Sequence, residues 1–134
     1  MMSHRPKRIL LVEDDSNIAQ LITLILESQG YIVESVTDGL SGVDCAKTTI
    51  PDLIIMDVMM PRMNGFEACR LIKDDLATRH IPLIMLSASH EVIDRDLGLA
   101  AGANRYCEKP FKPLQLVAVI KEALGTPLKG ISFS

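Results

Sequence analysis

Two kinds of segment alternate along this chain. Segments of the first kind are short, apolar and rich in β-branched residues, and unbroken apolar runs of this length are typical of strands buried on both faces. The predicted strands are Arg8–Val12, Tyr31–Val36, Leu53–Met56, Leu83–Leu86 and Arg105–Cys107. A longer segment follows each of them, and in the first of these longer segments apolar residues recur at helical spacing.

The longer segments predict one helix after each strand. The predicted helices are Ser16–Gln29, Gly39–Lys47, Phe66–Leu76, Glu91–Ala101 and Pro113–Leu124. Asp15 or Ser16 can cap the first helix and Gly30 can end it. Pro113 lies in the first turn of the last helix, and Gly125 follows its end. Strict alternation of strands and helices predicts an α/β protein whose parallel sheet is covered by helices on both faces.

Composition narrows the class of protein. A chain of 134 residues suits one domain, and 48% hydrophobic with 23% charged residues is a globular composition. The formal net charge of −3 gives no electrostatic footprint for nucleic acid. The apolar runs are too short to cross a bilayer, and no apolar signal-peptide region follows Met1–Lys7. We therefore expect a cytoplasmic protein with no direct nucleic-acid binding and no membrane binding.

The three cysteines do not form a recognisable metal or redox motif. Cys45, Cys69 and Cys107 are odd in number and widely spaced, with no C-x-x-C pair among them. We interpret them as small, mostly buried hydrophobic residues.

Polar residues stand where the predicted strands end. Glu13–Asp15 follow the first strand, Asp57 the third, Ser87 the fourth and Lys109 the fifth. In parallel α/β sheets the ligand site lies beyond the carboxyl ends of the strands. Two like charges about 4 Å apart repel by about 4 kcal/mol at an intermediate dielectric constant, so converging carboxylates require a cation. Mg²⁺ fits best, because it commonly binds through one or two carboxylates plus phosphate.

This set of residues suits phosphoryl transfer. A carboxylate can attack phosphorus to give an acyl phosphate, and the reaction needs positioning and charge neutralisation more than proton chemistry. Asp57 fits the nucleophile, Lys109 an ammonium that pairs with a phosphoryl oxygen, and Ser87 a hydroxyl that hydrogen-bonds to another oxygen. Taken alone, Asp57 could equally cap a turn and Lys109 could be an ordinary surface lysine.

Four motifs occur in order along the chain. They read Leu-Leu-Val-Glu13-Asp14-Asp15, then Leu-Ile-Ile-Met-Asp57-Val-Met-Met-Pro-Arg-Met-Asn-Gly65, then Pro-Leu-Ile-Met-Leu-Ser87-Ala, then Gly-Ala-Asn-Arg-Tyr106-Cys-Glu-Lys109-Pro110-Phe. Together they resemble the receiver domain of two-component response regulators over residues 7–125. The resemblance implies a flavodoxin-like, doubly wound (βα)5 fold with strand order 2-1-3-4-5. It leaves residues 1–6 as an N-terminal tail and 126–134 as a C-terminal tail or linker stub.

The resemblance also implies a role for each site residue. Asp57 is the phosphoacceptor, Asp14 binds Mg²⁺ directly, Glu13 acts through a water, and the backbone carbonyl of Met59 is a further ligand. Glu13 stands where aspartate is commoner in the family, which adds a methylene to this contact.

The remaining implied roles belong to a switch. Ser87 matches the switch hydroxyl, where threonine is commoner, and Lys109 matches the phosphate-pairing lysine, whose bond to Pro110 can be cis. Tyr106 matches the aromatic that changes rotamer, although it could also be a plain half-buried aromatic.

The implied function is signalling rather than metabolic catalysis. A sensor histidine kinase or a histidine phosphotransfer protein would supply the phosphoryl group, and the chain would catalyse only its own phosphorylation and slow dephosphorylation. The face made by the fourth helix, fifth strand and fifth helix would then change its affinity for an effector or for a second copy of the chain.

Three other functions fit parts of the pattern. A phosphatase of an unrelated α/β fold would carry Asp-x-Asp after the first strand, whereas Asp57 follows the third. A flavin or nucleotide binder would need a glycine-rich loop where Glu13–Asp15 would repel phosphate. A receiver that acts only as a docking module would not need the full acidic set and Lys109.

Overall fold

The computed structural model describes residues 5–60, 62–88 and 92–125. Within these residues, five strands alternate with five helices. The elements are β1 (Arg8–Val12), α1 (Ser16–Ser28), β2 (Ile32–Val36), α2 (Gly39–Thr49), β3 (Leu53–Asp57), α3 (Gly65–Asp74), β4 (Leu83–Ser87), α4 (Val92–Ala100), β5 (Arg105–Glu108) and α5 (Pro113–Ala123). The predicted order of elements is confirmed. Residues 1–4 and 126–134, which make up most of the two predicted tails, lie outside the described residues.

The strands form one parallel sheet in the order β2-β1-β3-β4-β5. This confirms the flavodoxin-like order. Strands β3, β4 and β5 each extend one residue beyond the predicted end, to Asp57, Ser87 and Glu108. The register explains the difference, because Asp57 pairs with Leu86 and Ser87 pairs with Glu108 in the ladder. Backbone hydrogen bonding thus continues past the last apolar side chain into the polar residues.

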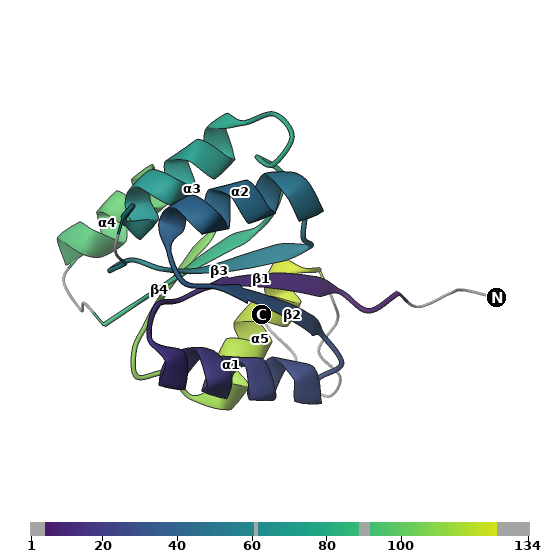
Figure 1. Cartoon of the computed structure of the whole chain (residues 1–134). Helices are drawn as coiled ribbons and strands as arrows, with labels where there is room; N and C mark the ends of the chain where they lie inside the picture. Colours follow the sequence, from purple (N-terminus) through teal and green to yellow (C-terminus); the bar gives the residue numbers. More distant parts are fainter. Residues whose placement is uncertain (1–4, 61, 89–91, 126–134) are drawn as a thin grey trace.

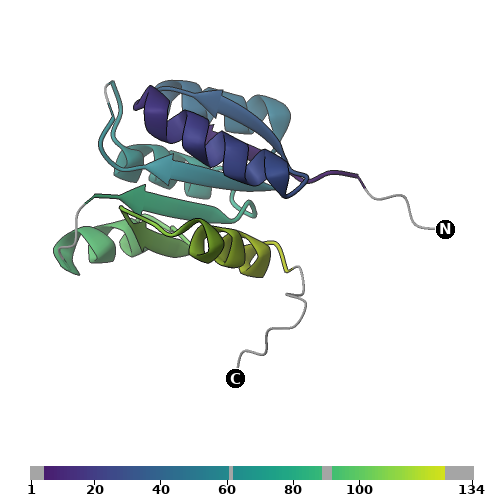
Figure 2. The same cartoon turned by 90° about the horizontal axis from the view of Figure 1, so that it is seen from below.

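Helices cover both faces of the sheet. Figure 1 shows α2, α3 and α4 above the strands and α1 and α5 below them, and Figure 2 shows α1 and α5 side by side from below. Alternate strand residues face opposite sides of the sheet. In β1, Leu10 and Val12 pack toward the layer of α2, α3 and α4, whereas Ile9 and Leu11 pack toward the layer of α1 and α5. This two-sided burial is the reason that the strands are unbroken apolar runs rather than alternating ones.

Local signals set the ends of the first helix. The Asp15 carboxylate accepts hydrogen bonds from the backbone N–H groups of Asn17 (2.9 Å) and Ile18 (3.1 Å), which confirms it as the N-cap. Gly30 follows the C-cap residue Gln29 with a φ of 90°. These caps place Glu13 and Asp14 in the short turn between β1 and α1, at the carboxyl edge of the sheet.

The three cysteines differ in burial. Cys69 is fully buried, as predicted, and burial raises the pKa of its thiol to about 11, whereas Cys45 and Cys107 are half-buried.

Among the helices that the structure describes, none is long and apolar enough to cross a membrane. The cytoplasmic location stays a prediction.

Candidate functional site

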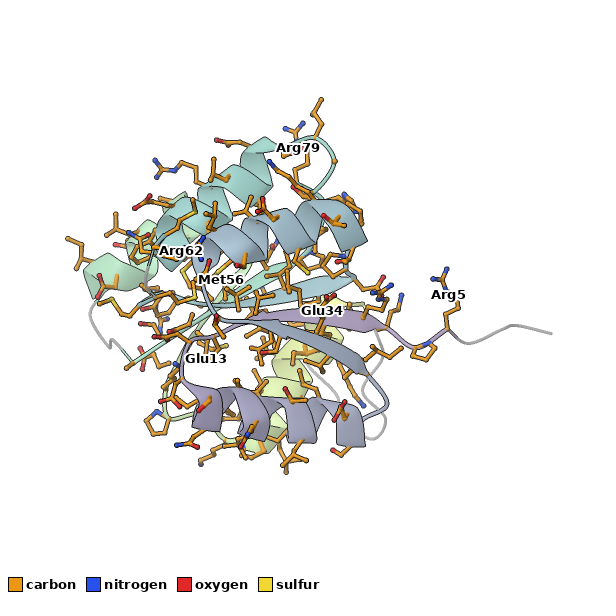
Figure 3. The ribbon with its side chains drawn as sticks, in the orientation of Figure 1. Arg5, Glu13, Glu34, Met56, Arg62 and Arg79 are labelled. Carbon is orange, nitrogen blue, oxygen red and sulfur yellow. The ribbon has the colours of Figure 1, made fainter. Side chains whose placement is uncertain are left out.

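Four strand ends bring the predicted site residues to one edge of the sheet. Asp57 and Ser87 are the last residues of β3 and β4, and Glu13 and Lys109 directly follow β1 and β5. Glu13, Asp57 and Ser87 are at most 6% exposed. The backbone N–H of Lys109 donates to the carbonyl of Ser87 at 2.7 Å, which aligns the ends of β4 and β5. Figure 3 shows Glu13 at this edge and Arg5 at the opposite one.

Lys109 bridges two of the acidic groups. Its Nζ donates to Glu13 Oε1 at 2.7 Å and to Asp57 Oδ1 at 3.2 Å, and its side chain is only 15% exposed. The Lys109–Pro110 bond is cis, as the resemblance implied. The ammonium therefore offsets the repulsion between two buried carboxylates that are 44 positions apart in the sequence.

The surroundings of Asp57 disfavour its negative charge. Burial is the main reason that the pKa of Asp57 rises to about 6, and the neighbouring Glu13 carboxylate raises it further against the opposing pull of Lys109. Burial alone would lower the pKa of Lys109, but its hydrogen bond to Glu13 and the attraction of Asp57 raise it above its usual value. A second cation near Asp57 would thus be attracted to this edge.

The acidic groups are close enough to share a metal ion. Glu13, Asp14 and Asp57 each offer a carboxylate oxygen, and these oxygens lie within 4.8 Å of one another. Asp14 is exposed, whereas the other two are buried. Glu13 is already engaged, since its Oε2 accepts the backbone N–H of Asp15 at 3.1 Å while Oε1 accepts Lys109. Hard oxygen donors that leave one exposed side open fit Mg²⁺, which keeps several of its waters.

Tyr106 is a residue of β5, and its ring lies against α4. It pairs with Met85 in the sheet ladder and is half-buried. A Cβ atom placed on Gly98 of α4 would lie 3.0 Å from the Tyr106 ring and 2.9 Å from the Met85 sulfur. The Arg95 guanidinium lies 5.8 Å from the ring centroid and pairs with Glu108 at 3.0 Å. The ring is therefore enclosed by α4 on one side.

Some residues at this edge could not be selected from the sequence. Gly98 and Arg95 meet Tyr106 only because of the rotation of α4, for which the sequence holds no signal. Asp38 and Arg62, whose ion pair joins the start of α2 to the segment that carries Met59, were also missed. Asp38 stands directly before a predicted helix, so its type and position could have marked it as an N-cap.

A comparison with known families decides the class. The family model described as the response regulator receiver domain matches residues 9–121. The chain belongs to this family.

The receiver is similar to curated regulators that are about twice its length. It is 37% identical over 118 residues to the DNA-binding response regulator MtrA of Mycolicibacterium paratuberculosis, with 88% of this chain and 51% of the relative covered. It is 43% identical over 116 residues to the transcriptional regulatory protein CseB of Streptomyces avermitilis, with 87% and 48% covered. The chain thus spans about half the length of these curated relatives.

The receiver is also similar to solved structures. The receiver domain of a sensor histidine kinase from Pseudomonas aeruginosa, which has a magnesium ion coordinated in its active-site cleft, is 36% identical with a TM-score of 0.85, covering 91% of this chain and 100% of that one. The chemotaxis response regulator CheY4 of Vibrio cholerae is 30% identical with a TM-score of 0.84, covering 89% and 99%. These relatives share the fold of the receiver over nearly their whole length.

Proposed function

We propose that this receiver takes a phosphoryl group on Asp57 from a phosphohistidine of a sensor histidine kinase or a histidine phosphotransfer protein. The contact of Lys109 with both Glu13 and Asp57 is the observation that carries the proposal, because it places a cation against a buried, reactive carboxylate. A carboxylate oxygen of Asp57 forms a bond to phosphorus while the phosphorus–nitrogen bond breaks. The donor imidazole leaves with the electron pair and takes up a proton.

Different residues at the edge would neutralise different parts of the charge on the phosphoryl group. Asp14, Asp57 and the backbone carbonyl of Met59 would hold Mg²⁺, with Glu13 contacting it through a water. When bound, Mg²⁺ neutralises charge on the phosphoryl oxygens. Lys109 donates to one phosphoryl oxygen and the Ser87 hydroxyl donates to another. One phosphoryl group is taken up per chain, and its slow hydrolysis returns Asp57, so the protein is not an enzyme that turns over a separate substrate.

Phosphorylation would be transmitted through Ser87 and Tyr106. Movement of Ser87 toward the phosphoryl group leaves space into which the Tyr106 ring turns. The surface of α4, β5 and α5 then changes its affinity for an effector or a second copy of the chain. The names of the longer relatives refer to DNA binding and transcription, but the formal charge of −3 supports action of the receiver itself through proteins.

Phosphoryl uptake tests the proposal directly. The protein is incubated with Mg²⁺ and acetyl phosphate, and its intact mass is measured over time. We expect a gain of one phosphoryl group per chain in the presence of Mg²⁺. No gain is expected when excess EDTA is added before the donor. An unchanged mass at saturating donor would contradict the proposal, and a docking-only receiver would give this result.

Gly98 gives a separate test of the Tyr106 switch. Gly98→Ala adds a methyl group against the Tyr106 ring and the Met85 sulfur, so we expect the ring to be displaced in the unphosphorylated protein. Overpacking costs about 1–3 kcal/mol, and the better helix propensity of alanine offsets up to about 1 kcal/mol of that cost. NMR of tyrosine-labelled protein checks this, with Tyr31 as an internal control, since the chain has only two tyrosines. Unshifted Tyr106 ring signals would count against a space-limited switch.

A further inference from the structure

Hydrogen bonds hold the segment between β3 and α3 at its start and at its end. The backbone N–H of Gly65 donates to the carbonyl of Val58 at 2.8 Å, and Val58 directly follows Asp57. Asn64 caps α3 by accepting the N–H of Glu67 at 3.0 Å. The segment that carries Met59 thus leaves the sheet at Asp57 and returns to the same place.

The far side of this segment lies against the start of α2. A Cβ atom on Gly39 would lie 2.3 Å from the carbonyl oxygen of Met63, a distance that no side chain could tolerate. Glycine is therefore required at the first residue of α2 for the two backbones to approach so closely. The amino end of α2 is thus packed against the β3–α3 segment at Met63.

An ion pair joins the same two elements. Asp38 caps α2, since its Oδ1 accepts the N–H of Ser41 at 2.8 Å, and this bond holds the pKa of Asp38 below its usual value. Its Oδ2 accepts Arg62 Nη1 at 3.4 Å. The Asp38 side chain is only 9% exposed, whereas that of Arg62 is 60% exposed. The cap thus fixes the carboxylate, and the carboxylate in turn holds the arginine.

Arg62 has an unfavourable backbone. Its φ of 70° lies in the left-handed region, which glycine adopts freely and arginine does not. Such a conformation persists only where surrounding contacts impose it. Among the described residues, the Asp38 carboxylate contacts Arg62 itself, and the close approach of Gly39 to Met63 holds the residue that follows it. Figure 3 shows Arg62 at the same edge of the molecule as Glu13.

We propose that Asp38 and Arg62 are positioning residues for Mg²⁺: by fixing the β3–α3 segment against α2, they keep the Met59 carbonyl in place to act as a ligand. The inference rests on the proposed function, which assigns the Met59 carbonyl to the metal. Neither side chain touches the metal. Their loss therefore weakens Mg²⁺ binding without removing the chemistry of Asp57.

Mg²⁺ titration by calorimetry tests this role. Asp38→Asn keeps the cap acceptor and removes the charge, Arg62→Gln removes the other partner, and the two are combined in a double variant. Each single variant should bind Mg²⁺ up to about fivefold more weakly than wild type, because an ion pair with one largely exposed partner contributes modestly. The double variant should be no weaker than the singles, since the ion pair acts as a unit.

Two further measurements separate positioning from a structural role. At saturating Mg²⁺, the rate of phosphoryl uptake from acetyl phosphate should return to that of wild type. Arg62→Gly relieves the backbone strain, so its unfolding temperature should equal or exceed that of wild type while its Mg²⁺ binding is still weakened. Lys47→Gln is the matched control, because it removes the surface pair of Lys47 with Asp75 (3.8 Å) and should leave Mg²⁺ affinity unchanged.

The outcomes distinguish the two proposals. If wild type binds Mg²⁺ and the Asp38 and Arg62 variants bind it equally well, the positioning role is overturned and the proposed function stands. If wild type itself binds no Mg²⁺, both the metal part of the proposed function and this inference are overturned. Weakened binding that tracks a lowered unfolding temperature in every variant, Arg62→Gly included, would also reject positioning.

Discussion

Asp57→Asn should abolish phosphoryl uptake from acetyl phosphate, with no gain in intact mass under conditions that fully phosphorylate wild type. The amide keeps the size of the side chain and can still accept a hydrogen bond from Lys109, so the edge should stay assembled. It cannot supply the anionic oxygen that forms the bond to phosphorus. The loss should therefore be complete and chemical in origin rather than a result of unfolding.

A matched variant makes this result interpretable. Asp44 is an exposed aspartate on α2, and Asp44→Asn should take up phosphate as wild type does. Both variants should retain cooperative unfolding. Uptake that persists in Asp57→Asn would assign the phosphoacceptor to another residue, with Glu13 and Asp14 as the neighbouring carboxylates.

We also expect the stability of metal-free wild type to fall as the pH rises from about 4 to about 6. The pKa of Asp57 is about 6 in the folded protein against an ordinary value of 3.8. In this window the folded protein holds a proton that the unfolded chain has released, so raising the pH favours unfolding. A difference of this size corresponds to at most about 3 kcal/mol, present as extra stability below pH 4 and lost above pH 6.

Asp57→Asn isolates this contribution. It removes the titrating group, so its stability should match that of wild type near pH 4 and exceed it by up to about 3 kcal/mol at pH 7.5. Urea unfolding in EDTA at both pH values measures the difference, with Asp44→Asn as the control that should follow wild type. Parallel stability curves for wild type and Asp57→Asn across this range would mean that Asp57 is ionised in the fold without penalty.

The position of Asp57 directly after an apolar run is one reason that the candidate site could be predicted from the sequence. Polar residues at the ends of apolar runs are conspicuous, and parallel strands bring their carboxyl ends to one edge. Asp57, Ser87 and Lys109 could therefore be selected as candidates from their places in the sequence, whereas the role of each came from the family resemblance and stays a prediction. Three of the predicted strands stopped one residue early because apolar character was used to end them, whereas the ladder continues to Asp57, Ser87 and Glu108.

Contacts between elements could not be predicted from the sequence. The approach of Gly39 to Met63 and that of Gly98 to Tyr106 depend on how each helix is rotated and how far it slides along the sheet. Local patterns fix which face of a helix is apolar but not its position to within an ångström. The hydrogen bond between Glu13 and Lys109 was likewise not predicted, since the resemblance implied only that Glu13 contacts the metal through a water.

The direction in which the helices run has a practical use. Arg105 at the start of β5 pairs with Glu122 in the last turn of α5, so α5 ends beside the edge where the strands begin. Figure 3 shows Arg5, near the amino-terminal end of the described chain, at that same edge and opposite Glu13. A fluorescent reporter or an immobilisation tag joined before Arg5 or after Gly125 would therefore leave the reactive edge open to a donor protein, and sensors built from this domain can be designed with attachments at either end.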